Sequence, residues 1–374
     1  MSKETAKEKE PKPKRSLANG AVMPGFEHRP NRLKPEFELN ELRWQKPLGY
    51  VRFVLEDAAR RVDESRAWFS RRFYRGDCHA HSQHSDGIGT VPEMAAMAKT
   101  AGLDFQYITD HWGLTQTKEC RRHRLWVGQE PVAHLHHLVV LGLKKVFVPG
   151  PDLAADCREV ARRGGTPFIP HPTGWWPSRV YRAEALQSLE SLPDPFLMEI
   201  VNGANNIVSA FDYTDAAAIA LWDKLLTKGR RVHALGNTDA HSPHGIGTVW
   251  NGVFAPRCEE SVVLRALAAG RCFVSEAPLL DLSVGPTGMG QRARRRGQLC
   301  IQAADARGLL LLRLVADGKT LRTWHPVGQP VVRKTLALPK TARTYVRLEA
   351  VSMDGKRGYT NPVYLQTATE SRKT

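Results

Sequence analysis

The sequence has no long apolar run and no closely spaced pair of cysteines. None of its apolar stretches approaches the roughly 20 residues that span a membrane. The six cysteines are scattered without a CxxC pair, which argues against a disulfide framework or a cysteine-based zinc site. Residues 1–17 are rich in Lys and Glu and lack the apolar segment of a secretory signal. These absences predict a cytoplasmic protein without a membrane span.

Acidic residues are scarce as well. The 374 residues include 38 Asp and Glu against 54 Lys and Arg, for a formal net charge of +16. The excess is uneven: residues 1–35 carry +5, residues 36–75 carry +2, residues 76–280 carry −2 and residues 281–374 carry +11. A basic excess of this size indicates an acidic partner. Because the central segment is nearly neutral, we expect a small anionic substrate, with nucleic acid as a minor alternative and no membrane.

Composition and periodicity divide the chain into five segments. Residues 36–75 place apolar side chains at helical spacing, and residues 76–280 alternate short apolar runs with helical stretches. Later residues form short strand-like runs separated by turns, among them 299–303 and 309–315. We therefore expect a disordered basic segment (1–35), a helical lead-in packed on the next domain (36–75), an α/β domain (76–280), a small all-β sandwich (281–366) and a polar tail (367–374).

One strand–helix–strand unit is well defined in the α/β segment. Thr90 and Glu93 form the pattern of a capping box, and Pro92 lies in the first turn of the helix that they begin. Gly102 is placed to end that helix, and residues 105–109 then read as a strand. Repetition of such units predicts an α/β fold with a parallel sheet or barrel.

Histidine is concentrated in this α/β segment, where 12 of the 14 histidines lie between His79 and His244. His79 and His81 are two residues apart after a strand-like run, so they project from one face together with Asp77. Two adjacent imidazoles chelate a divalent metal well, and Asp86 follows in a turn that brings a carboxylate back. A chance His-x-His pair on a surface strand is the alternative.

Four further polar groups follow apolar, strand-like runs. The carboxylate that ends the last of these runs needs a partner. For the other three groups the alternatives are, in chain order, a helix-capping turn, a solvated loop carboxylate and a solvent-facing loop histidine. The candidates are Asp110 with His111, Glu130 with His136 or His137, His171 between two prolines, and Asp239 with His241.

Together these motifs closely resemble the motif series of the PHP (polymerase and histidinol phosphatase) metallohydrolases. The matching order is His-x-His with Ser-Asp-Gly, then Thr-Asp-His, then Glu before His, then His-Pro and finally Asp-x-His, over roughly residues 76–278. A narrower similarity to the CehA/McbA-type branch comes from residues 126–130, 137–142, 198–202, 267–274 and 360–365. That branch more often has Gly where this chain has His136, which leaves open whether His136 or His137 is the ligand.

The resemblance implies a distorted (β/α)7 barrel followed by an Ig-like sandwich. The barrel is expected to hold two or three divalent transition-metal ions. The implied metal ligands are His79, His81, Asp86, His111, Glu130, His137, His171, Asp239 and His241. Glu130 bridges two ions in this scheme, and the expected catalytic residues are Glu130, Asp239 and His241. The mixture of imidazoles and carboxylates suits Mn²⁺, Zn²⁺ or Fe²⁺ better than Mg²⁺ or Ca²⁺.

The activity that the resemblance implies is hydrolysis by a hydroxide that bridges two ions, acting on phosphoesters of small metabolites or nucleotides. Carboxyl-ester or carbamate hydrolysis, nuclease activity and a non-catalytic binding module are the alternatives. Asp77 and Asp110 are expected to orient ligand histidines. Trp175, Trp176 and Arg179 follow the His-Pro motif and are the expected substrate contacts, with simple packing of the tryptophans as the alternative.

Overall fold

The computed structural model describes residues 47–133, 136–174, 183–203 and 213–366. The expected disordered segment at residues 1–35 and the polar tail at residues 367–374 lie outside these ranges, and so do Trp175, Trp176 and Arg179. In the described part no helix has both the length and the apolar character needed to cross a membrane. All six cysteines are free thiols.

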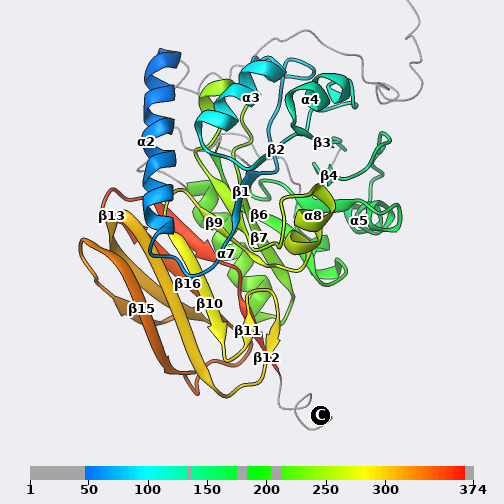
Figure 1. Cartoon of the computed structure of the whole chain (residues 1–374). Helices are drawn as coiled ribbons and strands as arrows, with labels where there is room; N and C mark the ends of the chain where they lie inside the picture. The colour runs from blue at the N-terminus through cyan, green and yellow to red at the C-terminus, as the bar shows by residue number, and fades with distance from the viewer. Residues whose placement is uncertain (1–46, 134–135, 175–182, 204–212, 367–374) are drawn as a thin grey trace, which may run out of the picture.

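The lead-in segment contains helix α2 (Leu48–Arg66), as its periodicity predicts. Val51, Leu55 and Val62 are buried on one face, whereas Val54 is exposed. The first half of α2 shares a core cluster with helix α3 of the α/β region, and its second half packs against strand β13 of the all-β region. Figure 1 shows α2 in blue above the strands of the all-β region. The helix therefore contacts both regions of the molecule.

The α/β region contains nine strands among the described residues and several helices. The strands are β1 (Tyr74–Asp77), β2 (Phe105–Ile108), β3 (Trp126–Gln129), β4 (Val139–Leu141), β5 (Thr166–Ile169), β6 (Phe196–Asn202), β7 (Val232–Asn237), β8 (Trp250–Val253) and β9 (Cys272–Ser275). The helices are α3 (Val91–Thr100), α4 (Thr117–His123), α5 (Leu153–Arg162), α6 (Ala183–Ser188), α7 (Tyr213–Thr227) and α8 (Glu260–Ala268), with short 3-10 turns η2 (Leu189–Ser191) and η4 (Pro243–Gly245).

Helix α3 forms as its sequence predicts. The Thr90 side chain accepts a hydrogen bond from the backbone N–H of Glu93, and the Glu93 side chain accepts one from the backbone of Thr90. Both orphan donors of the first turn are thereby satisfied. Gly102 follows the helix with φ of 67°, a left-handed conformation that glycine adopts without strain. The predicted strand–helix–strand unit is confirmed, because β1 and β2 pair in parallel on either side of α3.

The sheet is mixed and departs from a regular (β/α)7 barrel. Pairs β1–β2, β2–β3, β5–β6 and β6–β7 are parallel, whereas β3–β4, β4–β5, β1–β8 and β8–β9 are antiparallel. Among the described strands the registers pair β7 with β6, and β8 with β1 and β9. Beyond the ends of β1 and β7, an isolated parallel bridge joins Ala80 to Ala240. The α/β class is confirmed, and the closed seven-stranded barrel stays a prediction.

The all-β region contains the remaining strands. They are β10 (Leu279–Val284), β11 (Thr287–Gly288), β12 (Arg292–Ala293), β13 (Gln298–Ala316), β14 (Lys319–Trp324), β15 (Gln329–Ala337), β16 (Tyr345–Ser352), β17 (Arg357–Thr360) and β18 (Val363–Leu365). The two runs read as separate strands at residues 299–303 and 309–315 form one long strand, β13, with an irregularity between Ala304 and Leu309. Gly308, at φ of 86°, lies within it, so the chain bends without leaving the sheet.

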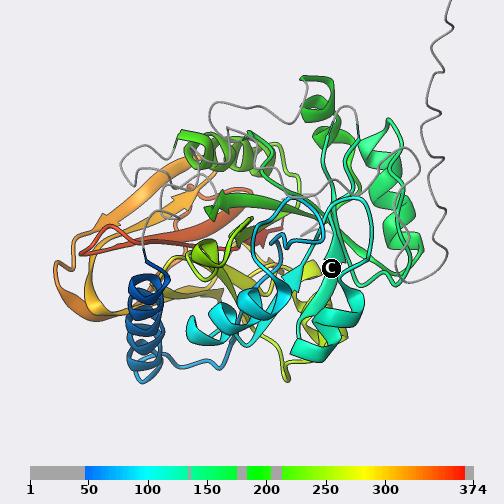
Figure 2. The same ribbon diagram turned by 90° about the horizontal axis from the view of Figure 1, so that it is seen from above.

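The two regions share a core. Trp222 of α7, Val274 of β9, and the tyrosines Tyr345, Tyr359 and Tyr364 of the last three strands belong to one buried apolar cluster. In both views the red C-terminal strands run from the all-β strands toward the green α/β part (Figures 1 and 2). The all-β region is therefore packed against the α/β region rather than tethered to it by a linker.

Candidate metal centre

The ends of β1 and β7 bring four candidate residues together. Beyond the two strands, the N–H of Asp239 donates to the carbonyl of His79, and the N–H of His81 donates to the carbonyl of Ala240. The chain thus continues as a parallel bridge, in which residues two apart face the same side. This geometry places His79 and His81 beside Asp239 and His241.

The first group consists of His79, His81, Glu130 and Asp239, all buried. The Nε2 atoms of His79 and His81 are 3.1 Å apart. The Oε2 atom of Glu130 is 3.1 Å from each of them, and the Oδ1 atom of Asp239 is 3.2 and 3.1 Å away. Ligands around a tetrahedral ion with bonds of about 2.0 Å are about 3.3 Å apart. These five distances are close to the edge length of a tetrahedral site, and the sixth pair, Glu130 with Asp239, lies within 4.8 Å.

The carboxylate of Glu130 also faces a second group. Its other oxygen, Oε1, is 2.9 Å from Nδ1 of His137 and 3.0 Å from Nε2 of His171. The loop after β3 folds back so that Val132 and His137 form an antiparallel bridge, which brings His137 over Glu130. The two oxygens of one carboxylate thus point at two different pairs of histidines, as a bridging ligand requires.

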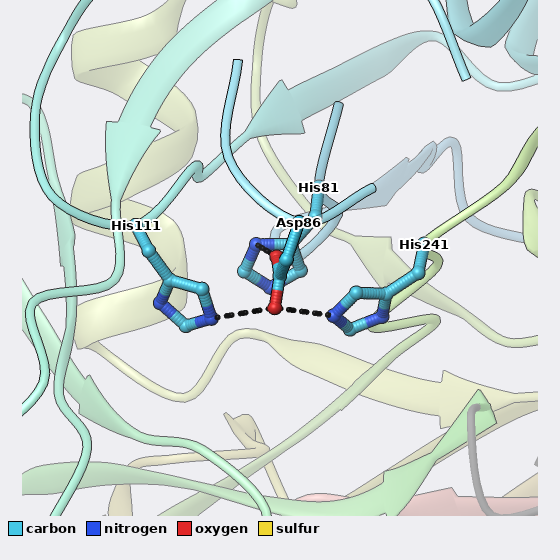
Figure 3. A group of neighbouring side chains, drawn as sticks. All are labelled: His81, Asp86, His111 and His241. Carbon is cyan, nitrogen blue, oxygen red and sulfur yellow. Dashed lines mark ion pairs between the residues drawn. The ribbon is translucent and has the colours of Figure 1, made fainter. Parts of the chain in front are cut away.

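The third group consists of His81, Asp86, His111 and His241, and Figure 3 shows Asp86 between the rings of His111 and His241. The Oδ2 atom of Asp86 is 3.5 Å from Nε2 of His111 and 3.6 Å from Nε2 of His241. In both histidines Nδ1 lies 2.8 Å from a backbone carbonyl, of Glu130 and of Asp239 respectively. A carbonyl only accepts, so Nδ1 carries the proton, and in the neutral rings Nε2 presents a lone pair to the carboxylate. A bound cation relieves that repulsion, and so does a proton on Nε2 of His241, whose pKa Asp86 raises against the effect of burial.

Two candidate ligands have strained backbones. His171 has φ of 27° and Asp239 has φ of 47°, a left-handed region in which residues other than glycine cost of order 1–3 kcal/mol. The N–H of His171 donates to a carboxylate oxygen of Glu199 at 2.8 Å, and the N–H of Asp239 donates to a carbonyl. Such strain persists only where surrounding contacts hold it, and it is concentrated at functional sites.

The charges in the centre favour bound cations. Burial alone would lower the pKa of His79, but the carboxylates of Asp239 and Glu130 raise it well above its usual value. The same carboxylates raise the pKa of His81 to about 10. Burial lowers the pKa of His137 to about 4, so that imidazole is neutral and offers a lone pair. Although burial opposes it, the surrounding imidazoles hold the pKa of Glu130 well below its usual range.

The donor set fits divalent transition metals. The three groups contain six imidazoles and three carboxylates, and within each group the facing ligand atoms lie within 4.8 Å of one another. Imidazole suits Zn²⁺ and Fe²⁺ and carboxylate suits Mn²⁺, so the mixed set fits these three ions better than Mg²⁺ or Ca²⁺, which prefer all-oxygen shells. All nine residues that the sequence suggests as ligands belong to these groups. Their roles as ligands are taken up as a proposal below.

Several other predicted residues lie elsewhere or act differently. His136 is turned away from the groups, with Nε2 3.3 Å from Asp156, so His137 is the histidine that faces Glu130. Asp77 accepts hydrogen bonds from Thr238 and Gln106, and Asp110 accepts them from Ser82 and Ser85. Among the described side chains neither carboxylate is bonded to an imidazole, because each strand end turns it toward neighbouring hydroxyl and amide groups. Asp77 does accept a hydrogen bond from the backbone N–H of His79 at 3.2 Å, and the expectation that these two carboxylates orient ligand histidines stays a prediction.

Glu199 is the carboxylate that the sequence reasoning missed. It lies on β6, is buried, and its Oε1 is 3.3 Å from Nδ1 of His79. The available signal was a Glu in the otherwise apolar run Met198–Val201, because a charge in a buried strand needs partners.

No protein-family model matches this chain, and no curated protein sequence does. Among solved structures, it is similar to a two-domain protein from Bacteroides vulgatus that contains a predicted PHP-like metal-dependent phosphoesterase. The identity is 17%, the match covers 78% of this chain and 95% of that one, and the TM-score is 0.44. PsfC from Pseudomonas syringae matches at 16% identity over 54% of this chain and 89% of its own, with a TM-score of 0.38.

A lesion-specific endonuclease from Pyrococcus furiosus matches at 14% identity, over 52% of this chain and 56% of its own, with a TM-score of 0.36. Similarities of this size do not define a function. The assignment that follows therefore rests on the side chains of this molecule.

Proposed function

We propose that this protein is a metal-dependent hydrolase of the PHP type that cleaves phosphoesters of small anionic molecules. The observation that carries the proposal is the carboxylate of Glu130. One of its oxygens faces His79 and His81 at 3.1 Å, and the other faces His137 and His171 at 2.9 and 3.0 Å. A carboxylate shared in this way is the characteristic element of a two-metal hydrolytic site.

The residues have distinct tasks in this proposal. His79, His81, Glu130 and Asp239 hold one ion; Glu130, His137 and His171 hold a second; and Asp86, His111 and His241 hold a third. When bound, such ions supply Lewis acidity to the substrate and lower the pKa of water. The strand ends bury most of these side chains, and the carbonyls beside His111 and His241 fix which ring nitrogen faces inward.

Two observations favour a phosphoester substrate: the formal charge of the α/β region and the presence of three adjoining metal-binding groups. Residues 76–280 carry a formal −2, so attraction of an anion has to come from the ions and not from a basic groove. Three adjoining groups offer separate positions for the oxygens of one phosphoryl group. Trp175, Trp176 and Arg179 stay candidate substrate contacts on the sequence alone.

The test compares substrates and one matched pair of variants. Protein purified without added ions is analysed for metal and assayed on p-nitrophenyl phosphate, bis-p-nitrophenyl phosphate, a p-nitrophenyl ester and a carbamate. We expect at least two transition-metal equivalents and turnover of a phosphoester. Glu130→Gln should lower kcat by more than the roughly 10–100-fold that loss of a supporting residue costs. Glu159→Gln, on the exposed face of α5, is the control and should keep wild-type activity.

Three results would contradict the proposal in different ways. Absence of metal together with no activation by Mn²⁺ would exclude a metal-dependent enzyme. Hydrolysis of the carbon esters alone would exclude the phosphoester class and favour the carbamate or carboxyl-ester alternative. Full activity of Glu130→Gln would exclude the bridging role.

A further inference from the structure

Glu199, which is not among the candidate ligands, makes several hydrogen bonds to residues of the metal centre. It lies in the middle of β6 and is 1% exposed. Its Oε1 accepts from Nδ1 of His79 at 3.3 Å and from Nδ2 of Asn237 at 2.8 Å. Its Oε2 accepts from the N–H of His171 and from Nδ2 of Asn202, both at 2.8 Å. Four donors therefore converge on one carboxylate.

These four donors reach two of the three groups. His79 belongs to the first group and His171 to the second. The amide of Asn202, while donating to Glu199, also lies 3.1 Å from Oδ2 of Asp239. One side chain outside the ligand set therefore contacts a ring, a strained backbone and, through an amide, a carboxylate of the centre.

We propose that Glu199 is the positioning residue of the metal centre. By accepting from Nδ1 it keeps a proton on that atom, so Nε2 is the nitrogen of His79 left to bind a metal. By accepting from the N–H of His171 it holds the left-handed backbone that aims this ring at Glu130. Carboxylate–histidine pairs of this kind orient the ring and increase its basicity toward a metal. The inference rests on the proposed function, because it presupposes bound ions.

Only a carboxylate fits this position. A glutamine offers one acceptor oxygen and an NH₂ group that would face other donors. Asn237 cannot turn its amide to compensate, because its Oδ1 already accepts from the N–H of Cys78 and from Nδ2 of Asn251, both at 2.9 Å. Glu199→Gln should therefore lose one or more of the four contacts while conserving side-chain volume.

The experiment measures metal affinity and not only activity. Full-length wild-type, Glu199→Gln and Glu199→Asp proteins are stripped of metal and titrated with Zn²⁺ against a chromophoric chelator. Each is also loaded with Co²⁺, and the visible absorption bands are recorded. We expect Glu199→Gln to bind Zn²⁺ about 10–100-fold more weakly, with shifted Co²⁺ bands. Glu199→Asp, which keeps the charge, should recover part of the affinity.

A matched control separates positioning from general stability. Asp305 is another fully buried carboxylate, but it pairs with Arg61 beneath α2. Asp305→Asn should destabilise the fold and leave Zn²⁺ affinity and the Co²⁺ bands unchanged. If Glu199→Gln does not fold, Asn202→Ala tests the same network, and a fall in Zn²⁺ affinity of several-fold is expected.

The outcomes distinguish the two proposals. Wild-type affinity and an unchanged Co²⁺ spectrum in Glu199→Gln, or in Asn202→Ala where that variant replaces it, would overturn the positioning role alone. Equal losses of affinity in Asp305→Asn and Glu199→Gln would also overturn it, since the effect would then be general. Failure of the wild-type protein to bind any transition metal would overturn the proposed function and this inference with it.

Discussion

Two adjacent histidines, His136 and His137, have different partners because their side chains point in opposite directions. The first is buried against Asp156, and the second lies 2.9 Å from Glu130. Successive residues of an extended segment point to opposite faces, so the two rings cannot share a role. The sequence left this choice open, because both residues are the same type at nearly the same position.

This difference gives a matched pair of variants. His137→Ala should weaken metal binding by more than about 100-fold, because it removes a candidate ligand of the second group. His136→Ala should leave metal affinity unchanged and lower the free energy of unfolding by about 1–3 kcal/mol, because a buried partner of Asp156 is lost. Chelator competition and urea unfolding measure the two effects. Similar losses of metal affinity in both variants would contradict the assignment.

At the level of elements, strand β7 is held on one side by asparagine side chains instead of by the backbone of a neighbouring strand. The N–H of Ala234 donates to Oδ1 of Asn361 at 2.7 Å, and the N–H of Gly236 donates to Oδ1 of Asn251 at 3.0 Å. Both asparagine amides also donate back to the carbonyl of the same residue. Each amide thus substitutes for a peptide group of a neighbouring strand.

The same strand contains a buried histidine that makes stability depend on pH. His233 is fully buried on β7 and its Nδ1 lies 3.0 Å from the carbonyl of Ala268. Burial lowers its pKa from 6.5 to about 4. Below pH 6.5 the His233 imidazole is therefore protonated in the unfolded chain, whereas in the folded protein it stays neutral until about pH 4. Stability from this residue is complete above pH 6.5 and is lost as the pH falls to about 4, by roughly 3 kcal/mol.

His233→Asn tests this prediction, since it retains a donor for Ala268 and does not titrate in this range. With a chelator present in both samples, urea unfolding is followed between pH 7 and 4. The wild-type free energy of unfolding should fall more steeply than that of the variant, by about 3 kcal/mol over the interval. Parallel curves would show that His233 titrates normally in the folded state.

At the scale of the whole molecule, the all-β region completes the α/β region. Asn361 lies between β17 and β18 and is fully buried. Its amide hydrogen-bonds the backbone of Ala234 on β7 and also donates to the carbonyl of Cys272 on β9. Arg347 of β16, 1% exposed, pairs with Asp223 of α7 at 2.7 Å. Part of the basic excess of residues 281–374 is therefore used at the junction between the two regions.

Asn361→Ala should destabilise the whole chain. It leaves a buried N–H and carbonyl of Ala234 without the amide, and each unsatisfied group costs about 1–3 kcal/mol. Urea unfolding, followed by both tryptophan fluorescence and circular dichroism, measures the change. Gln329→Ala, on the exposed edge of β15, is the control and should change stability by less than about 0.5 kcal/mol. A loss equally small in Asn361→Ala would show that the amide is dispensable.

The sequence by itself determined the features that depend on local spacing. The capping box at Thr90 and Glu93, the parallel β1–α3–β2 unit and the pairing of His79 with His81 all follow from short periodic patterns. The candidate ligands could be singled out because their motifs, taken in order along the chain, resemble the PHP series; each one alone had another explanation, and the choice between His136 and His137 stayed open. Local rules of this kind need no knowledge of distant partners.

Only the tertiary structure decided the features that depend on distant contacts. Glu199 contacts His79, His171 and two asparagines, and the sequence around Glu199 does not predict these partners. The orientation of His137, the different partners of Asp77 and the merging of two expected strands into β13 depend likewise on neighbouring strands. The physical reason is that hydrogen bonds of buried polar groups are satisfied wherever the fold supplies a donor, at any separation along the chain.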